Sequence, residues 1–185
     1  AIVQFLDHAD RRIRRYIRAK RKLIALLNEQ KQIIIHNAVT RGTDSRAPMK
    51  DSGVEWLGEI PAHWKVVPLS WVLAQRKENN RPIRTTDILS LSLESGVIPY
   101  AEKKGGGNKA KEDLSAYALA YPGDIVVNSM NVVVGSVGIS KYFGAVSPVY
   151  YMLYPRRSDD LVEYFGFIFQ DVAFQRSLFG LGNGI

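Results

Sequence analysis

Residues 1–38 read AIVQFLDHAD RRIRRYIRAK RKLIALLNEQ KQIIIHNA, a stretch that contains neither proline nor glycine. Its apolar residues recur at gaps of three and four, the spacing of one face of an α-helix. They are Leu6, Ala9, Ile13, Tyr16 or Ile17, Leu23, Leu27, Ile34 and Ala38. Gly42 follows as a stop signal. A helix of this length extends about 57 Å at 1.5 Å per residue, so its apolar stripe must meet another helix or another chain.

The basic charge of the protein lies on this predicted helix. The whole chain has 185 residues and a formal net charge of +7. Residues 1–42 contain ten lysines and arginines against three acidic residues, which accounts for the entire excess, whereas residues 43–185 are neutral overall. Most of the basic residues lie between Arg11 and Lys22. This asymmetry indicates an acidic partner or nucleic acid.

Two interpretations of the basic helix stay open. It is either a coiled-coil arm with a solvated basic face, or an arm whose basic face lies against DNA phosphates or an acidic partner surface. A helix on a membrane surface fits less well, because the basic cluster covers one third of the helix and no tryptophan lies on it. We expect the partner-binding residues to be Arg11, Arg14, Arg15, Arg18, Ile13, Ile17, Leu23, Leu27 and Ile34.

A change of period marks a separate globular part. Residues 1–42 form the predicted spacer helix, residues 43–48 a polar linker, and residues 49–185 the predicted domain. Alternating apolar and polar residues predict a half-buried strand over 88–93, and a turn at 95–96 leads into another strand over 97–100. Further strands are expected over 124–127, 132–139 and 146–154, with helices over 114–121 and from 159 to about 179. The predicted fold class is therefore α+β, with a long coiled-coil helix followed by a mixed or antiparallel sheet and short helices.

Composition argues against several classes of protein. The absence of cysteine rules out disulfides, thiolate metal sites and thiol nucleophiles. The three histidines are scattered without metal-ligand spacing, so we predict no metal site. No apolar run approaches the roughly 18 residues of a membrane span, and the first residues lack the pattern of a secretory signal. We therefore expect a cytoplasmic protein that does not enter a membrane.

Polar loops of the domain carry the side-chain types that read DNA bases. Arginine and lysine pair with guanine, and asparagine and glutamine pair with adenine. The candidate DNA-binding residues are Arg76, Lys77, Asn79, Asn80, Arg81, Lys103, Lys104, Asn108, Lys109 and Asn131. Asparagine and arginine suit base edges, whereas lysine suits phosphates. A solvated surface loop is the alternative for each. A neutral domain lacks the charge of an autonomous high-affinity DNA binder, so we expect it to act within a larger assembly.

Two other functions stay open as alternatives. Asp87, Glu102 and Lys104 loosely match the D…E-x-K pattern of nucleases, in which two carboxylates hold Mg²⁺ and the lysine positions or activates water. Glu102 adjoins a glycine-rich stretch, however, and catalytic carboxylates are better held on rigid elements. The second alternative is a coiled-coil scaffold that does not bind DNA. We expect a chain without catalysis of its own.

Two stretches of the domain resemble a known family. The first is MKDSGVEWLGEIPAHWKVVPL at residues 49–69, and the second begins with YPGDIVVNSM at 121–130. The second stretch continues through Gly135, Gly138 and Gly144 to Ser147-Pro148-Val149-Tyr150. Both are similar to target recognition domains of the specificity subunit of type I restriction–modification systems. The N-terminal helix is similar to the helix that links two such domains. Residues 76–120 match no fixed pattern, and target specificity varies in this part of the family's domains.

The resemblance implies a non-catalytic subunit that reads one half of a bipartite site in double-stranded DNA. It implies that the helix docks modification (methyltransferase) subunits, that these carry S-adenosylmethionine, and that a restriction subunit completes the complex. No cofactor is then expected on this chain. The family has two domains and two antiparallel helices, whereas one of each is present here. We therefore expect either a fragment that lacks the C-terminal end of its domain or a half-subunit that pairs as a homodimer. Trp56, Leu57, Ile60 and Trp64 are expected to pack the start of the domain.

Overall fold

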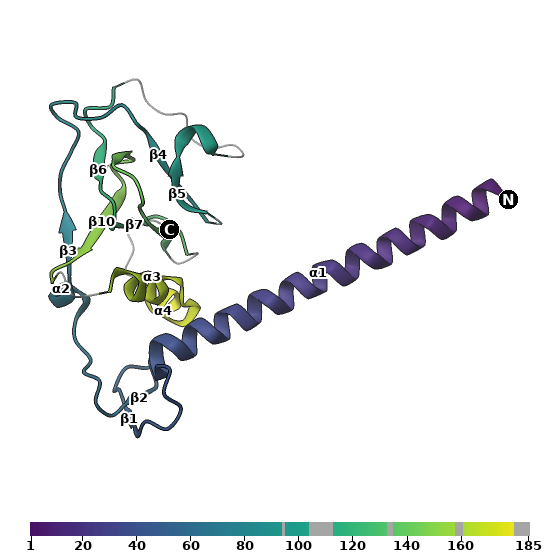
Figure 1. The fold of residues 1–185 in the computed structure, drawn as a ribbon, viewed down its shortest axis with the longest axis horizontal. Coiled ribbons are helices and arrows are strands. Elements are labelled where there is room, and N and C mark those ends of the chain that lie inside the picture. Colours follow the sequence, from purple (N-terminus) through teal and green to yellow (C-terminus); the bar gives the residue numbers. More distant parts are fainter. Residues whose placement is uncertain (94, 104–112, 133–134, 158–160, 180–185) are drawn as a thin grey trace.

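The computed structural model describes residues 1–93, 95–103, 113–132, 135–157 and 161–179. A long helix precedes a domain of antiparallel sheets and short helices (Figure 1), which confirms the predicted α+β class. In chain order, the elements are α1 (Ile2–Arg41), β1 (Met49–Asp51), β2 (Glu59–Pro61), α2 (Leu69–Val72), β3 (Leu73–Arg76), β4 (Leu89–Ser92), β5 (Gly96–Pro99), the 3₁₀ helix η1 (Tyr100–Glu102), β6 (Ala118–Ala120), β7 (Ile125–Asn128), β8 (Val137–Ile139), β9 (Gly144–Val146), β10 (Tyr150–Pro155), α3 (Val162–Gln170) and α4 (Val172–Ser177).

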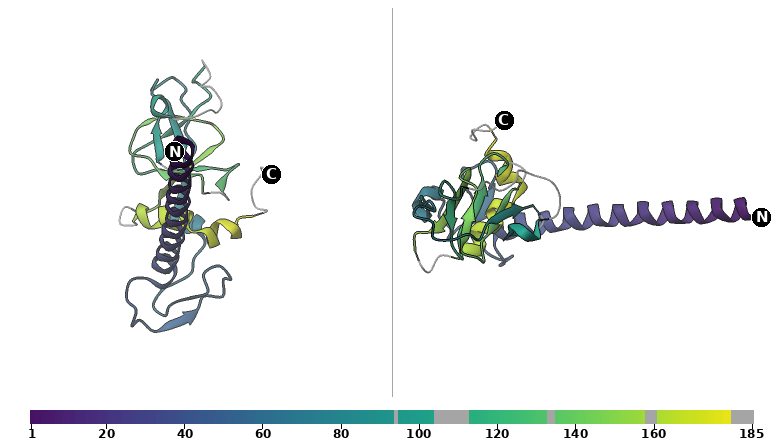
Figure 2. Two further views of the ribbon diagram at one scale, coloured as in Figure 1. Left: turned by 90° about the vertical axis from the view of Figure 1, so that its right-hand side faces the viewer. Right: turned by 90° about the horizontal axis from the view of Figure 1, so that it is seen from above.

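The predicted long helix is confirmed, and it projects from the domain as an arm (Figures 1 and 2). It ends at Arg41, and Gly42 follows with a φ of 72°, a left-handed conformation that glycine adopts at little cost. A Cβ atom on Gly42 would also lie 3.2 Å from a ring carbon of Trp64. Ile35 and Val39, near the end of α1, are buried in a core shared with α3 and α4. The domain therefore holds the arm by its C-terminal turns.

The central sheet has the strand order β3–β10–β7–β8, and its neighbours are antiparallel. Successive side chains of a strand point to opposite faces, so the sheet contributes to two cores. Ile125 and Leu153 pack on the face that meets α1, α3 and α4. Val126 and Met152 pack on the other face, against residues of the β4–β5 and β6–β9 pairs. The sheet therefore lies between a helical layer and a layer of paired strands.

The hairpin that begins the domain packs as predicted. Strand β1 pairs with β2, and Ile60 on β2 is buried. The ring of Trp56 meets Phe174 edge to face at a centroid distance of 5.0 Å, and Trp64 meets Tyr164 at 6.3 Å. Aromatic pairs of this geometry add to the energy of burying apolar area. These contacts attach the hairpin to the helical layer. The predicted bounds of the linker, residues 43–48, and of the domain, residues 49–185, stay predictions.

One predicted helix is wrong. Residues 118–120 lie within the range 114–121 but form strand β6, which pairs with β9. Leu119 is fully buried in this position, and Tyr117 just before the strand is also buried. Helix propensity is a weak preference that tertiary context overrides, and here strand pairing decides the conformation of an alanine-rich segment.

Other predicted elements are shorter than expected. The last predicted helix is divided at Asp171, whose backbone is extended (φ −71°, ψ 124°) and whose Oδ1 accepts a hydrogen bond of 2.8 Å from the Phe174 N–H at the start of α4. Its predicted start at 159–160 lies outside the described residues. The strand predicted over 132–139 includes residues 133–134, which lie outside the described residues, and among its described residues Val137–Ile139 form strand β8. The strand predicted over 146–154 is interrupted at 147–149, between β9 and β10.

Candidate nucleic-acid interface

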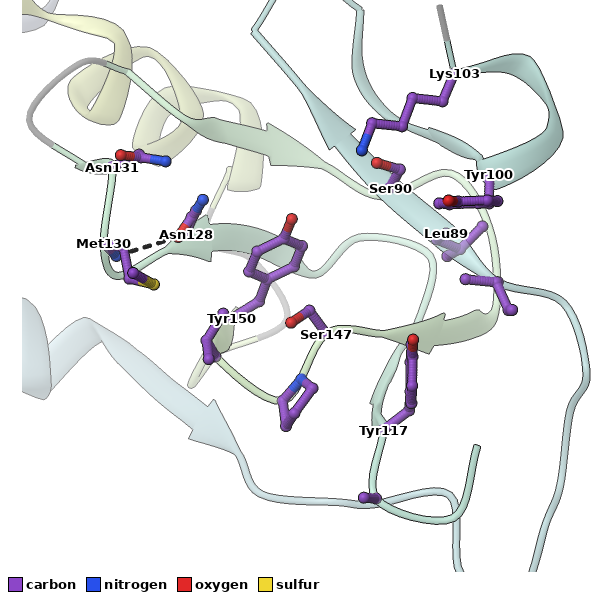
Figure 3. Close-up of a pocket in the computed structure, with 14 residues that line it drawn as sticks. Leu89, Ser90, Tyr100, Lys103, Tyr117, Asn128, Met130, Asn131, Ser147 and Tyr150 are labelled. Atoms are coloured by element: carbon purple, nitrogen blue, oxygen red, sulfur yellow. Dashed lines mark hydrogen bonds between the residues drawn. The ribbon is translucent and has the colours of Figure 1, made fainter. Parts of the chain in front are cut away.

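A cavity of about 500 Å³ lies where β7 ends and β10 begins. Its lining combines apolar residues, among them Leu89, Met130 and Val149, with a set of aromatic and polar side chains (Figure 3). The aromatic and polar side chains are Tyr100, Tyr117, Tyr150, Asn128, Asn131, Ser90, Ser147 and Lys103. Among the described residues that line this cavity, which we call the Tyr150 cavity, there is no aspartate or glutamate. The cavity can therefore offer planar rings, amides, hydroxyls and one positive charge to a ligand.

Strand pairing positions two of these groups. Asn128 ends β7 and lies directly opposite Tyr150, the first residue of β10. The Oδ1 atom of Asn128 accepts a hydrogen bond of 3.1 Å from the Met130 N–H (Figure 3). This bond uses the amide oxygen and leaves the two Nδ2 hydrogens for other acceptors. Asn131 follows in the same turn, where its backbone N–H donates to the Asn128 carbonyl at 3.1 Å.

The turn before β10 positions Tyr150. The Tyr150 N–H donates to the Ser147 carbonyl at 3.0 Å, and the Ser129 hydroxyl donates to the Val149 carbonyl at 2.9 Å. The second bond ties this turn to the end of β7. Burial raises the pKa of the Tyr150 hydroxyl above its ordinary value of 10.0. Tyr150 is therefore protonated at neutral pH and can donate a hydrogen bond.

Lys103 brings positive charge to the same cavity. Its Nζ atom lies 5.7 Å from the centroid of the Tyr100 ring, within the range of a cation–π contact. Its backbone N–H donates to the Tyr100 carbonyl at 3.1 Å, at the end of η1. Lys103 and Asn131, two of the predicted DNA-binding residues, thus line one cavity although they come from different loops.

Arg76 does not fit the predicted role of an exposed base-reading residue. Its Nε and Nη2 atoms donate to the two carboxylate oxygens of Asp124 at 2.9 and 3.1 Å, and Asp124 is 1% exposed. Its guanidinium carbon also lies 4.3 Å from the ring centroid of Tyr121 and 4.8 Å from that of Tyr154. The hydrogen bonds to Asp124 raise the pKa of Arg76. Reaching a base would break a buried ion pair, so Arg76 is a structural residue here.

Asn80 is also a structural residue rather than a DNA contact. Its side chain is fully buried. The Oδ1 atom accepts from the N–H groups of Arg84 and Thr85 at 2.8 and 3.2 Å, and Nδ2 donates to the Thr85 carbonyl at 2.9 Å. Asparagine commonly satisfies loop backbone groups in this way. The correction to the prediction follows from burial, which a polar loop sequence does not reveal.

The other predicted DNA-binding residues divide into two groups. Lys77, Asn79 and Arg81 are exposed. Their loop lies beside the Tyr150 cavity, because the Asn80 N–H donates to the carbonyl of Tyr117 at 2.8 Å. The second group lies outside the described residues and comprises Lys104, Asn108 and Lys109. DNA contact by either group stays a prediction.

Residues that the sequence reasoning did not select complete the cavity. Tyr100, Tyr117, Tyr150, Asn128 and Ser147 all line it. Asn128, Ser147 and Tyr150 belong to the second stretch that resembles target recognition domains, and this was the available signal for them. The proximity of Ser147 and Tyr150 to Asn128 depends on the pairing of β7 with β10, which sequence spacing does not specify.

The predicted partner-binding residues on α1 are accessible. The apolar members Ile13, Ile17, Leu23, Leu27 and Ile34 are between 43% and 60% exposed. Arg14 donates to Asp10 of the same helix at 2.6 Å, and Arg11 donates to the Asp7 carbonyl at 3.2 Å. Arg15 and Arg18 are exposed as well. Their binding to a partner stays a prediction.

The alternative of a Mg²⁺-dependent nuclease has little geometric support. Asp87 and Glu102 are exposed, and Lys104 lies outside the described residues. No group of three or more histidine, aspartate or glutamate side chains in the described part of the chain could hold a metal ion.

Among the described helices, none combines the length and apolar character that a membrane crossing requires.

Comparison with known proteins adds no family assignment. No protein-family model matches the chain, and a search of curated proteins finds no significantly similar relative. The sequence motifs and the geometry of the arm and the cavity are therefore the features of this chain that bear on its function.

Proposed function

We propose that this chain is the DNA-recognition part, without catalysis of its own, of a type I restriction–modification complex. Its domain reads one half of a bipartite site in double-stranded DNA. Its helix α1 docks the modification subunits, which carry S-adenosylmethionine and methylate the DNA. A second recognition half, from a longer chain or from another copy, completes the site, and the restriction subunit joins the full complex.

The exposed length of α1 is the observation that supports this proposal best. The helix has 40 residues, which corresponds to about 60 Å. Its buried residues, Ile35, Val39 and Thr40, all lie in the last turns. Full burial of one large apolar side chain contributes about 1.5–3 kcal/mol of stabilising free energy. Burial of several side chains of the exposed stripe against a partner would therefore stabilise the complex substantially. A rigid arm with an unpaired apolar stripe suits a spacer that holds recognition domains at a set distance.

The distribution of charge supports a division of labour between arm and domain. Neutralising phosphates supplies a large share of DNA affinity, and the basic excess lies within residues 1–42. Base specificity requires amides, guanidinium groups and apolar contacts at base edges. The domain offers such groups at the Tyr150 cavity and on Lys77, Asn79 and Arg81. The arm and its partners thus provide affinity, while the domain provides specificity.

Reconstitution with a cognate modification subunit tests the proposal. The complex should methylate DNA in the presence of S-adenosylmethionine, and sequencing of methylated sites should reveal one defined target. Methylation without sequence preference would contradict a recognition role and support a scaffold. Mg²⁺-dependent nicking by the chain alone, lost on Glu102→Ala, would support the nuclease instead.

A further inference from the structure

We propose that the Tyr150 cavity holds a single nucleotide whose base is turned out of the DNA duplex. The proposal deepens the proposed function and rests on it for the source of the nucleotide. The shared chemistry is a planar base that carries a phosphate, which either DNA or a free nucleotide could supply. We commit to DNA as the source.

The size and shape of the cavity favour a ligand that enters it. Its volume of about 500 Å³ falls within the range of small-molecule sites, roughly 300–1,000 Å³. Three separate parts of the domain enclose it: β4 with η1, the segment before β6, and the junction of β7 with β10. A base that stays stacked in a duplex presents only its edge, so filling a cavity requires the base to leave the stack.

The lining matches the chemistry of one nucleotide. Tyrosine rings replace the stacking that a base loses when it leaves the duplex, and Tyr150 stands between the asparagine pair and Ser90 (Figure 3). The amides of Asn128 and Asn131 can pair with the edge of the base, and paired amide contacts suit adenine in particular. Lys103 provides charge for a phosphate, and the described lining residues include no carboxylate that would repel it.

The neighbouring loop places DNA contacts next to the cavity. Besides the bond between Asn80 and Tyr117, the Leu119 N–H donates to the Glu78 carbonyl at 2.9 Å. These bonds attach the loop of Lys77, Asn79 and Arg81 to the segment that forms one wall of the cavity. A duplex that contacts the exposed loop therefore passes close to Tyr150.

Duplexes with one extrahelical base provide the test. Fluorescence anisotropy measures binding of the full 185-residue chain to four short duplexes, each with one bulged A, C, G or T, and to the fully paired duplex. The cost of unstacking is already met in a bulge. We expect one bulged duplex to bind about tenfold more tightly than the paired one, a factor within the range of stacking on one aromatic side chain. Equal binding of bulged and paired duplexes would overturn the proposal.

Variants assign the preference to the cavity. Tyr150→Ala and Asn128→Ala should remove the preference for the bulged duplex, whereas Tyr150→Phe should retain most of it because the ring remains. Asn131→Ala alters an exposed side chain and keeps the test valid if Tyr150→Ala fails to fold. Lys77→Ala is the matched control, since loss of a phosphate contact should weaken all duplexes alike. A preference that survives both asparagine variants would refute the assignment.

Free ligands distinguish the source of the nucleotide. The four deoxynucleoside monophosphates and inorganic phosphate are titrated calorimetrically into the same chain. A free nucleotide that saturates the cavity and is not displaced by the bulged duplex would overturn DNA as the source, and so would binding of inorganic phosphate alone. Site-specific methylation with equal bulged and paired binding would leave the recognition function intact and reject the cavity. A Tyr150-dependent preference for the bulged duplex without any methylation specificity would support the nucleotide cavity and reject the proposed recognition function.

Discussion

Replacing Arg76 by alanine should destabilise the domain and leave the recognised DNA sequence unchanged. Arg76 makes two hydrogen bonds to the carboxylate of Asp124, which is 1% exposed. The Tyr121 N–H also donates to Asp124, at 2.9 Å. After the substitution, the buried carboxylate keeps this bond but loses its counter-charge. The variant therefore removes a structural ion pair rather than a base contact.

The magnitude follows from this geometry. Breaking a buried ion pair by removing one partner costs about 3–5 kcal/mol. The side chain of Arg76 is 22% exposed, so some solvent reaches the pair and the lower end of that range applies. The double variant Arg76→Met/Asp124→Leu should recover most of the loss, because replacing both partners removes the unpaired buried charge. It leaves the Tyr121 N–H without its acceptor, which costs about 1 kcal/mol.

Urea unfolding followed by circular dichroism measures these differences as changes in the midpoint at constant slope. Sequencing of methylated sites, with the modification subunit bound and well below the unfolding temperature, measures the DNA target. The neighbouring Lys77→Ala is the control, since Lys77 is exposed and should affect DNA affinity rather than stability. An Arg76→Ala variant as stable as the wild type, or one with a new target sequence, would refute the reasoning.

Three further predictions test other parts of the molecule. Gly138→Ala should lower the free energy of unfolding by about 1–3 kcal/mol, because a Cβ would lie 2.7 Å from the Cα of Gly96 on the facing strand. Gly166→Ala, which meets only an isoleucine side chain at 2.9 Å, should cost less in the same urea titration. The hydrogen bond from Arg84 lowers the pKa of Glu78 below its ordinary value of 4.5, so the stability that Glu78 contributes is present above pH 4.5 and is lost as the pH falls through the lowered pKa. Glu78→Gln should flatten that acid limb, and an unchanged pH dependence of unfolding would contradict this role. Substitution of glutamate for the arginines of the helix, at Arg11, Arg14, Arg15 and Arg18, should weaken assembly or DNA affinity most at low salt and leave the methylated sequence unaltered. Electrophoretic mobility shifts measure assembly and affinity, and sequencing of methylated sites checks the target.

Local patterns in the sequence were sufficient for the arm and for several strands. The absence of glycine and proline over residues 1–38, together with a helical apolar period, predicts α1, and Gly42 marks its end. Alternation over residues 88–93 likewise predicts β4. These features depend on residues within a few positions of one another, so the sequence carries them directly. The polar composition of the loops also indicated Lys103 and Asn131, which line the cavity.

The same local patterns misjudged residues whose environment comes from distant parts of the chain. The sequence around Arg76 predicts an exposed loop arginine. In the structure Arg76 forms hydrogen bonds with Asp124, which is 48 positions away in the chain. Asn80 reads as a base-reading amide until the backbone of Arg84 and Thr85 encloses it. Composition identifies the chemistry of a side chain, but it does not identify the groups within the fold that form hydrogen bonds with it.

By itself, the sequence determined the α+β class, the long basic arm and the polar chemistry of the loops, because helix and strand periods and net charge are properties of neighbouring residues. The tertiary structure alone decided that residues 118–120 form a strand and that Arg76 is paired with the buried carboxylate of Asp124. It also decided that Asn128, Tyr150 and Lys103 share one cavity. Each of these outcomes depends on strand pairing and burial between segments far apart in the chain, where the energy of long-range contacts outweighs local preference.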